Sequence, residues 1–303
     1  MSIAAIYTDE NAARAHLERL LWPEGPICPH CGNSDPERIH KLAGKSTRPG
    51  VFKCRECEKP FTVTVGTVME RSKIKLHQWV YATHLLTSSK KGISAHQIGR
   101  MLGLTYKSAW FLCHRIREAM RPAELTPMGG SGKTVEVDET LMGKQEGAPK
   151  RLKRGNQFRN IVLTLVERGG SARSFHIDGT TLGTLVPILR MNVNRESTLM
   201  TDEANWYRAP GREYANHLSV NHAAQEYAVG EITTNTVEGY FSIFKRGMKG
   251  VYQHCAERHL HRYLSEFDFR YSHRVALGYD DAARAAKALE GAKGKRLTYR
   301  RPN

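Results

Sequence analysis

Two pairs of cysteines constrain the fold of this chain more than any other feature of its sequence. Cys28 and Cys31 are separated by two residues, as are Cys54 and Cys57, and 22 residues lie between the pairs. Each pair is typical of a tight turn that directs two sulfurs toward one point. Four thiolates complete the tetrahedral coordination of Zn²⁺ and leave no open position. The spacing therefore predicts a structural zinc site in a segment too small to fold on its own core.

The residues around these cysteines are typical of a zinc ribbon. Residues 51–53 and 61–65 look like short strands on either side of the second pair. His30 lies within the first pair and could replace a ligand, but four cysteines already complete the coordination shell. The N-terminal residues lack the basic and apolar regions of a signal peptide, which favours a reducing compartment and metal binding over disulfides.

The composition is that of a folded and strongly basic protein. Of the 303 residues, 40% are hydrophobic and 25% are charged, which permits a sizeable core and excludes wholesale disorder. The formal net charge of +16 indicates a polyanionic partner, with nucleic acid as the leading candidate. No run approaches the roughly 18 apolar residues that span a membrane. No G-x-x-x-x-G-K-[ST] loop is present, so we expect no nucleotide cofactor.

The most basic segment has the pattern of a helix-turn-helix. Residues 73–125 carry nine basic and two acidic side chains. Helical spacing over residues 76–87 is followed by a helix expected from Ser94 to Gly103 and by a basic helix over residues 106–120. In a helix-turn-helix the second of two such helices enters a DNA groove. The alternative interpretation of this segment is a plain helical bundle that links two domains. The DNA-binding candidates in this segment are Thr105, Tyr106, Lys107, Ser108 and Arg115.

After a link rich in glycine and proline at residues 122–132, strand and helix patterns alternate. A helix is expected over residues 181–191 and a long one from about Thr234. This order of elements is typical of a ribonuclease-H-like core: three strands, a helix, a fourth strand and a helix that carries an acid. Such a core is a mixed sheet with helices. Asp138 is expected at the end of the first strand and Asp202 at the end of the fourth. The expected strands cover residues 134–140, 160–167, 172–177 and 197–204.

Three carboxylates of this core are candidates for a metal-dependent active site. Asp138 and Asp202 lie near each other in such a fold, and Glu238 arrives from the long helix. Phosphodiester cleavage builds up charge on the attacking and leaving oxygens, which two Mg²⁺ ions about 3.5–4 Å apart stabilise, and hard oxygen ligands bind such ions. Lys245 lies seven residues after Glu238, on the same helix face. Asp178 competes for the second acidic position, although a turn role suits it better.

The chain resembles the bacterial insertion-sequence transposases of the ISXO-like group over about residues 10–275. The resemblance rests on the runs VEVDET, TDEANWY and TNTVEGYFSIFKRGMKGVYQHCAERHLHRYLSEFDFRYSHR, of which the last is the most specific. In that group a zinc ribbon and a helical DNA-binding region precede a D-D-E catalytic domain. The resemblance implies that Asp138, Asp202 and Glu238 bind the catalytic Mg²⁺ ions and that Lys245 contacts DNA near them.

The resemblance also implies an activity, partners and a location. The implied activity is cleavage and strand transfer at the terminal inverted repeats of an insertion sequence. A dimer or higher assembly of the chain would act on double-stranded DNA. Its location would be the bacterial cytoplasm, where it would associate with the nucleoid. Residues 1–72 would form an N-terminal helix and zinc ribbon, 73–125 the helix-turn-helix, 126–275 the catalytic domain and 276–303 a basic tail with a short exposed helix. Further DNA contacts are expected from Lys150, Arg151, Lys153, Arg154 and Arg246.

The sequence departs from the group near the third acid. Members often have a histidine where this chain has Thr233, and some use an asparagine in place of the acid. Asn235 lies one helical turn before Glu238 and is therefore the alternative third ligand. We favour Glu238, because a carboxylate binds Mg²⁺ better than a neutral amide does.

Two other functions fit parts of the sequence. A transposase-derived DNA-binding regulator without catalytic activity would keep the zinc ribbon and the helix-turn-helix, but a decayed copy should have lost at least one of the candidate catalytic residues. A different ribonuclease-H-like nuclease is disfavoured, since such enzymes recognise nucleic-acid shape and need little sequence reading. The sequence therefore predicts a DNA transposase with Zn²⁺ and Mg²⁺.

Overall fold

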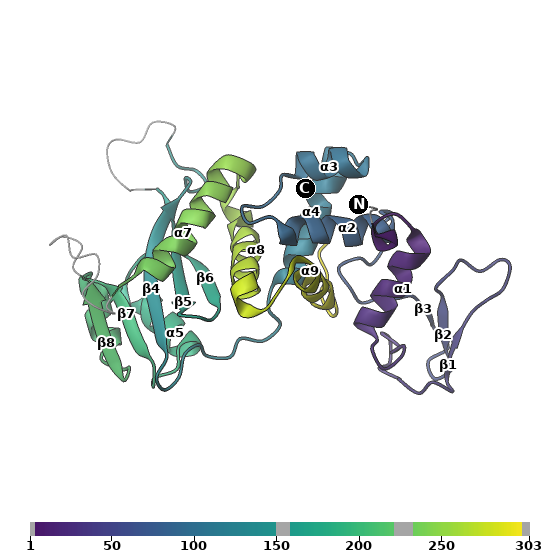
Figure 1. The fold of residues 1–303 in the computed structure, drawn as a ribbon, viewed down its shortest axis with the longest axis horizontal. Helices are drawn as coiled ribbons and strands as arrows, with labels where there is room; N and C mark the ends of the chain where they lie inside the picture. Colours follow the sequence, from purple (N-terminus) through teal and green to yellow (C-terminus); the bar gives the residue numbers. More distant parts are fainter. Residues whose placement is uncertain (1–3, 150–157, 221–232, 299–303) are drawn as a thin grey trace. The chain divides into compact units, whose positions relative to one another are not determined.

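The computed structural model of the chain describes residues 4–149, 158–220 and 233–298 (Figure 1). These residues divide into two units with hydrophobic cores of their own. The first unit draws on Met1–Ser89, Ile93–Pro122 and Tyr279–Asn303, and the second on Lys90–Gly92 and Ala123–Gly278. None of the helices in the described residues is long and apolar enough to cross a membrane.

The first unit begins with a helix that is followed by a small sheet. After the 3-10 turn η1 (Ala5–Tyr7), helix α1 (Glu10–Leu21) begins at Asp9, whose side chain accepts the N–H of Ala12 at 2.7 Å. Three antiparallel strands then pair in chain order. They are β1 (Ile39–Lys41), β2 (Phe52–Cys54) and β3 (Pro60–Phe61).

This sheet differs from the prediction in two respects. The strand expected over residues 61–65 ends at Phe61, because the chain turns and the N–H of Val65 bonds to the carbonyl of Thr62 at 3.0 Å. Strand β1 was not predicted, because its polar sequence shows no alternation. It is formed by long-range pairing, in which Ile39 lies opposite Cys54.

The helices of the predicted helix-turn-helix are confirmed. Ser94 caps one helix by accepting the N–H of Gln97 at 3.2 Å, and Thr105 caps the next by accepting the N–H of Ser108 at 3.3 Å. Gly103, between them, has a φ of +64°, a left-handed conformation that suits glycine at the end of a helix. The helices are α2 (Leu76–Ser88), α3 (Ala95–Leu102) and α4 (Tyr106–Met120).

The helix predicted as exposed near the end of the chain is instead partly buried. Helix α9 (Asp281–Glu290) packs against α2 and α4. Ala288 and Leu289 are buried, and Arg284 donates from Nη1 to the carbonyl of Thr87 at 3.2 Å. Small alanine side chains let helices approach closely, so a segment without large apolar residues can still contribute to a core.

The second unit is built on a five-stranded mixed sheet with the order β6-β5-β4-β7-β8. Strand β4 pairs antiparallel with β5 and parallel with β7, which pairs parallel with β8. This topology is consistent with a ribonuclease-H-like core. The strands are β4 (Thr134–Met142), β5 (Asn160–Glu167), β6 (Ala172–Ile177), β7 (Thr198–Asp202) and β8 (Asn216–Val220).

The predicted strands are confirmed, but one predicted acid occupies a different position within its strand. Because β4 continues to pair with β5 as far as Met142, Asp138 lies in the middle of β4 and not at its end. Asp202 is the last residue of β7, as predicted. Strand β8 was not predicted, because the exposed Asn216 and Ser219 and the half-buried His217 leave it without a clear apolar pattern.

Helices cover both faces of this sheet (Figure 1). On β5, Val162 and Val166 pack with α7 (Asn235–Gly247) and α8 (Leu260–Ser272), whereas Leu163 and Leu165 pack on the opposite face with α5 (Leu182–Asn192). The continuous apolar run of β5 is thus buried on both sides. Short elements complete the unit: η2 (Asn205–Tyr207), α6 (Arg208–Gly211), the π-helical turn η4 (Met248–Tyr252), η5 (Glu257–His259) and η6 (Val275–Leu277).

A buried carboxyl group joins β6 to α7 and α8. Asp268 accepts hydrogen bonds from the hydroxyls of Tyr240 at 2.6 Å and Ser174 at 2.7 Å, and from the N–H of Ser174 at 2.8 Å. Burial nevertheless raises the pKa of Asp268 to about 6, because desolvation outweighs these bonds. The carboxyl is therefore more easily protonated in the folded chain than in the unfolded one.

Replacing Asp268 with Asn should remove a pH-dependent contribution to stability. The folded pKa of about 6 lies above the unfolded value of about 3.9, so the contribution is fully present below about pH 4 and is lost as the pH rises through 6. From about pH 5 to about pH 7.5, the free energy of unfolding of the wild type should fall relative to that of Asp268→Asn by about 1 kcal/mol. Urea unfolding at both pH values measures the difference, and a difference that does not change with pH would contradict the shifted pKa.

Candidate functional site

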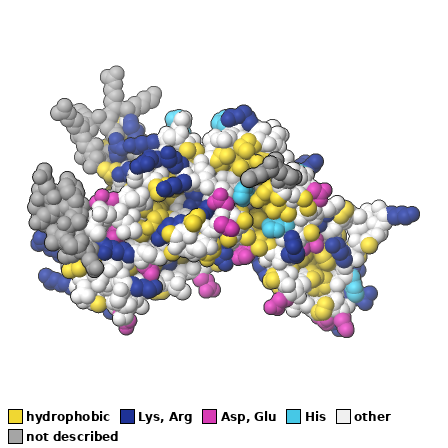
Figure 2. Space-filling view, viewed as in Figure 1, with side chains coloured by type: hydrophobic (Ala, Val, Ile, Leu, Met, Phe, Trp, Pro, Cys, Tyr) yellow, Lys and Arg dark blue, Asp and Glu magenta, His cyan; other side chains and the backbone are white. Residues whose placement is uncertain are grey.

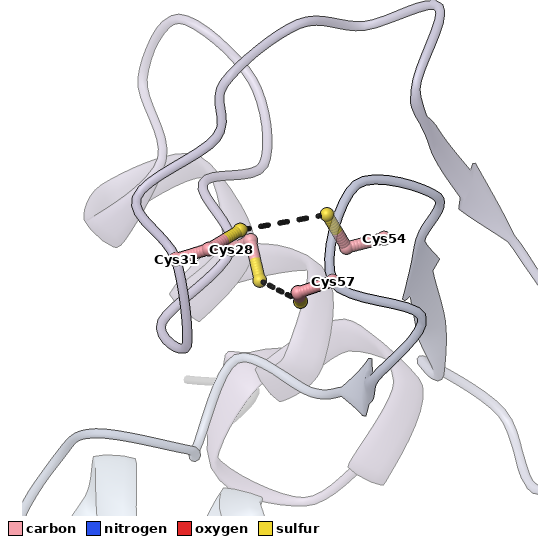
Figure 3. Close-up of side chains that lie close together, drawn as sticks. All are labelled: Cys28, Cys31, Cys54 and Cys57. Carbon is pink, nitrogen blue, oxygen red and sulfur yellow. Dashed lines mark hydrogen bonds between the residues drawn. The ribbon is translucent and has the colours of Figure 1, made fainter.

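The four predicted zinc ligands meet in the first unit (Figure 3). Their sulfur atoms all lie within 4.8 Å of one another, with 3.6 Å between Cys28 and Cys57 and 3.7 Å between Cys31 and Cys54. Four sulfurs placed tetrahedrally at the zinc–sulfur distance of about 2.3 Å are about 3.8 Å apart. The group therefore fits a Zn²⁺ ion with no open position, as the sequence predicts.

Hydrogen-bond donors around Cys54 favour the thiolate form of this ligand, which is the form that binds zinc. The N–H of Cys57 is the main cause that lowers the pKa of Cys54 to about 6, and the side chain of Asn33 and the N–H of Glu56 add to it. The Nδ2 of Asn33 lies 3.6 Å from the sulfur. Such outer hydrogen bonds hold a ligating sulfur in place and stabilise its charge.

Strands β4 and β7 place two predicted acids at the same level of the sheet. The strands are parallel, and in their register Thr134 lies opposite Thr198 and Glu136 lies opposite Met200. Continuing this register by two residues sets Asp138 opposite Asp202. Residues two apart on a strand share a face, so Asp138 lies on the face of Glu136, which is covered by α7.

Helix α7 brings the third acid to the first two. Asp138, Asp202 and Glu238 line one pocket of about 470 Å³ together with Lys245. Glu238 accepts a hydrogen bond from the hydroxyl of Thr234 at 3.0 Å. The remaining lining residues are Glu139, Thr140, Phe241 and Ser242.

The alternative third ligand is placed differently. Asn235 is the first residue of α7 and is exposed, and it is absent from the described lining of the pocket. Asp178, the competitor for the second acid, is likewise exposed just after β6 and outside that lining. The fold thus brings Glu238 and Asp202 into the pocket of Asp138. The described lining of that pocket includes neither Asn235 nor Asp178.

An ion pair between a half-buried arginine and a buried carboxylate fixes the start of α7 against β4. Glu136 is fully buried, and Arg168 donates from Nε to its Oε1 at 2.6 Å. The Oε2 atom of Glu136 accepts the backbone N–H groups of Thr236 and Val237, each at 2.9 Å, in the first turn of α7. Arg168 also donates to the carbonyl of Thr233 at 2.7 Å. These bonds connect β4 to α7 and so fix the separation of the acids that the two elements carry.

Sequence analysis did not identify this pair. The available signal was an acid at an inward position of a strand, two residues before Asp138, where a charge needs a partner. The partner could not be deduced, since Arg168 lies 32 residues away at the end of another strand.

Replacing Glu136 with Ala should lower the free energy of unfolding by about 3 kcal/mol, because it removes the carboxylate that pairs with Arg168 and leaves two N–H groups of α7 without that acceptor. Urea unfolding followed by circular dichroism measures the loss. The exposed Glu196 provides the control, since Glu196→Ala should remain near the wild type. Equal stability of the two variants would contradict the anchoring role of Glu136.

Burial and repulsion both shift the titration of the pocket carboxyls. Burial is the main cause that raises the pKa of Asp138 to about 7, and the charges of Glu139, Asp202 and Glu238 raise it further. The N–H of Glu139, which donates to Asp138 at 2.7 Å, acts in the opposite direction. Neighbouring carboxylates that repel one another are a donor set that a divalent cation stabilises, so these residues fit Mg²⁺.

Glu139 is a pocket residue that sequence analysis missed. Burial raises its pKa, and it accepts a hydrogen bond from the hydroxyl of the buried Tyr207 in η2. The signal was its position next to Asp138, but alternation along a strand predicts that neighbours point to opposite faces. The pocket lining nevertheless includes both residues, together with Thr140 that follows them in β4.

The predicted reading end of the helix-turn-helix lies at the surface of the first unit. Thr105 and Lys107 are exposed, Ser108 is half-buried, and Tyr106 is 50% exposed. The ring of Tyr106 stacks on His96 of α3, with 4.1 Å between the ring centroids. This end of α4 therefore presents polar, charged and aromatic groups to solvent.

Arg115 does not lie where the sequence predicted a DNA contact. It is buried, and its guanidinium donates to the carbonyls of Leu297 at 3.0 Å and Glu70 at 3.1 Å. Burial lowers its pKa. Arg115 therefore connects segments within the first unit.

The other predicted DNA contacts fall into two groups. Lys245 lines the carboxylate pocket and, with Arg246, a second pocket. The remaining candidates lie outside the described residues; they are Lys150, Arg151, Lys153 and Arg154.

Two family models match the chain. The ISXO2-like transposase domain matches residues 129–272, which include every residue that lines the carboxylate pocket. The transposase zinc-ribbon domain matches residues 8–60, which include the four cysteines. Together the matches cover more than half of the chain, and residues 61–128 lie outside both.

Relatives and solved structures add weaker similarities. An uncharacterized protein in transposable element ISH50 of Halobacterium salinarum is 24% identical in an alignment 286 positions long, and the alignment covers 87% of this chain and 91% of the relative. A chain in the cryoEM structure of the simian T-cell lymphotropic virus intasome in complex with PP2A regulatory subunit B56 gamma is 13% identical, with a TM-score of 0.31 over 56% of this chain. The present chain spans 63% of that solved chain.

Proposed function

The chain belongs to the ISXO2-like transposase family, and on this premise we propose that it is a DNA-cutting enzyme. It would cut DNA at the ends of an insertion sequence and transfer the cut strands to a target. One observation carries the catalytic part of the proposal. Asp138, Asp202 and Glu238, from three separate elements, line one pocket together with Lys245. Three acids and a cation in one pocket are what metal-dependent phosphodiester chemistry requires.

Each residue has a distinct role in this proposal. Asp138, Asp202 and Glu238 would hold two Mg²⁺ ions, which when bound stabilise negative charge on the attacking and leaving oxygens. Without cations these carboxylates would repel a phosphodiester, so the reacting bond itself would enter the pocket only in the metal-loaded protein, whereas contacts elsewhere on the chain would hold the DNA with or without metal. Lys245 would contact a phosphate oxygen beside the reacting bond. Glu136 and Arg168, which contact no substrate, would keep Glu238 in position.

The first unit would supply recognition. The exposed start of α4, with Thr105, Tyr106, Lys107 and Ser108, has the chemistry to contact the bases and phosphates of double-stranded DNA. The zinc ribbon would add contacts at the inverted repeats. Because an insertion sequence has two ends, we expect two or more copies of the chain on the DNA, in the bacterial cytoplasm and associated with the nucleoid.

The decisive experiment is metal-dependent cleavage of DNA that carries the inverted repeats flanking the gene. We expect nicks at the repeat ends with Mg²⁺ or Mn²⁺ and none without a divalent cation. Specific binding without cleavage in either metal would favour a DNA-binding regulator. Cleavage without preference for the repeat ends would favour a general nuclease.

A further inference from the structure

A second pocket beside the carboxylate pocket is lined by four cationic side chains. This cationic groove, of about 710 Å³, is formed by Lys91, Lys245, Arg246 and Lys249, with Ser242, Gly250 and Val251. It shares Ser242 and Lys245 with the carboxylate pocket, so the two hollows adjoin along α7. Lys and Arg side chains gather over α7 on the face shown in Figure 2.

Helix periodicity and a change of helix type build one wall of the groove. Ser242, Lys245, Arg246 and Lys249 follow one another at intervals of three, one and three residues, which places them on one helix face. At Met248 the α-helix becomes the π-helical turn η4, which carries Lys249. Such turns are often found at functional sites.

Two glycines let a distant segment form the opposite wall. A side chain at Gly247 would come within 2.6 Å of the carbonyl of Lys91, and one at Gly92 would come within 2.0 Å of the hydroxyl of Tyr252. Gly92 also has a φ of +95°, which other residues rarely adopt. Close backbone contact therefore holds Lys91 beside η4, although more than 150 residues separate Lys91 from Lys249.

Among the described residues that line the groove, no acidic residue balances the cations. Within the described part of the chain, none of its four cations has a carboxylate oxygen within 4.0 Å. Arg246 is instead oriented by the bond that it donates to Ser242 at 2.7 Å. An exposed cluster of uncompensated cations attracts a polyanion.

We propose that the cationic groove binds consecutive phosphates of the DNA strand whose reacting phosphodiester lies in the carboxylate pocket. The inference rests on the proposed function and assigns DNA contacts to Lys91 and Lys249, which the sequence analysis did not name. The lining residues that the structure describes include no aromatic ring on which a base could stack. The contacts are therefore with the backbone and independent of sequence.

The salt dependence of DNA binding tests this proposal. The probe is a short fluorescein-labelled duplex of arbitrary sequence, and its affinity for the full chain is measured by fluorescence anisotropy over a range of salt concentrations. Each lost phosphate contact lowers the slope of log affinity against log salt by about 0.9. Lys91→Gln should therefore lower the slope by about 0.9, and the double variant with Lys249→Gln by about 1.8.

Lys90 supplies a matched control. It is the neighbour of Lys91 in the same segment and is exposed, but it does not line the groove. Lys90→Gln removes the same charge and should leave the slope unchanged. Equal slopes for Lys91→Gln and the wild type, or equal reductions in Lys90→Gln and Lys91→Gln, would overturn the groove assignment. Failure of the wild type to cleave DNA in Mg²⁺ would count against the proposed function, and the slopes would still report the groove.

Discussion

Replacing Asp202 with Asn should reduce Mg²⁺-dependent DNA cleavage by at least about a thousandfold, which corresponds to about 4 kcal/mol of activation free energy. The substitution removes one negative ligand from the pocket while keeping the size of the side chain. Asp202 also accepts the N–H of Ala204 at 3.1 Å, and an asparagine oxygen can accept the same bond. The turn after β7 should therefore persist and the loss should be confined to metal binding and cleavage. Nicking of repeat-end DNA, quantified on denaturing gels, measures it.

Asp178 provides the control for this substitution. It is another aspartate that follows a strand of the same sheet, but it is exposed and lies outside the described lining of the pocket. Asp178→Asn should cleave as the wild type does, and both variants should bind DNA as tightly as the wild type. Unchanged cleavage by Asp202→Asn, or a loss of DNA binding as large as its loss of cleavage, would exclude a catalytic role for Asp202.

The features that could be predicted from the sequence are those set by neighbouring residues. The cysteine spacing places four sulfurs in two turns, and the strand patterns at residues 160–167 and 172–177 predicted strands with the observed bounds. Ser94, Gly103 and Thr105 mark helix ends through capping groups that act within four residues. Local hydrogen bonding and alternation were sufficient for these elements.

The features that escaped prediction depend on contacts between distant residues. The sequence shows that Arg115 is basic, but its bonds to Leu297 and Glu70 form only after α4 has packed in the first unit. A net charge counts buried and exposed cations alike, so the excess over residues 73–125 overstates the charge available to DNA. The anchor of α7 by Glu136 and the wall of the groove at Lys91 likewise need the tertiary fold.

Replacing Cys54 with Ser should release the zinc and unfold residues 28–61. The apolar core of this segment consists of Ile39, Phe52 and Phe61 with the two buried ligands Cys28 and Cys54, which is too little buried area to offset chain entropy. Structural zinc sites contribute about 10 kcal/mol or more to such segments. Zinc content by mass spectrometry should fall from one equivalent to none. Near-ultraviolet circular dichroism should change because the ring of Trp22 packs edge-on against Phe52, with 5.4 Å between centroids.

The loss should stay within the first unit, because the second unit has its own cores around α5, α7 and α8. Cys54→Ser should therefore bind the inverted repeats more weakly and keep metal-dependent nicking of nonspecific DNA. Cys255→Ser is the matched control, since Cys255 lies in the second unit and should leave the zinc content unchanged. Zinc retained by Cys54→Ser would refute the four-cysteine site. Zinc lost without any change around Trp22 would show that the metal does not stabilise the segment, and the ribbon would then have to fold on its aromatic core alone.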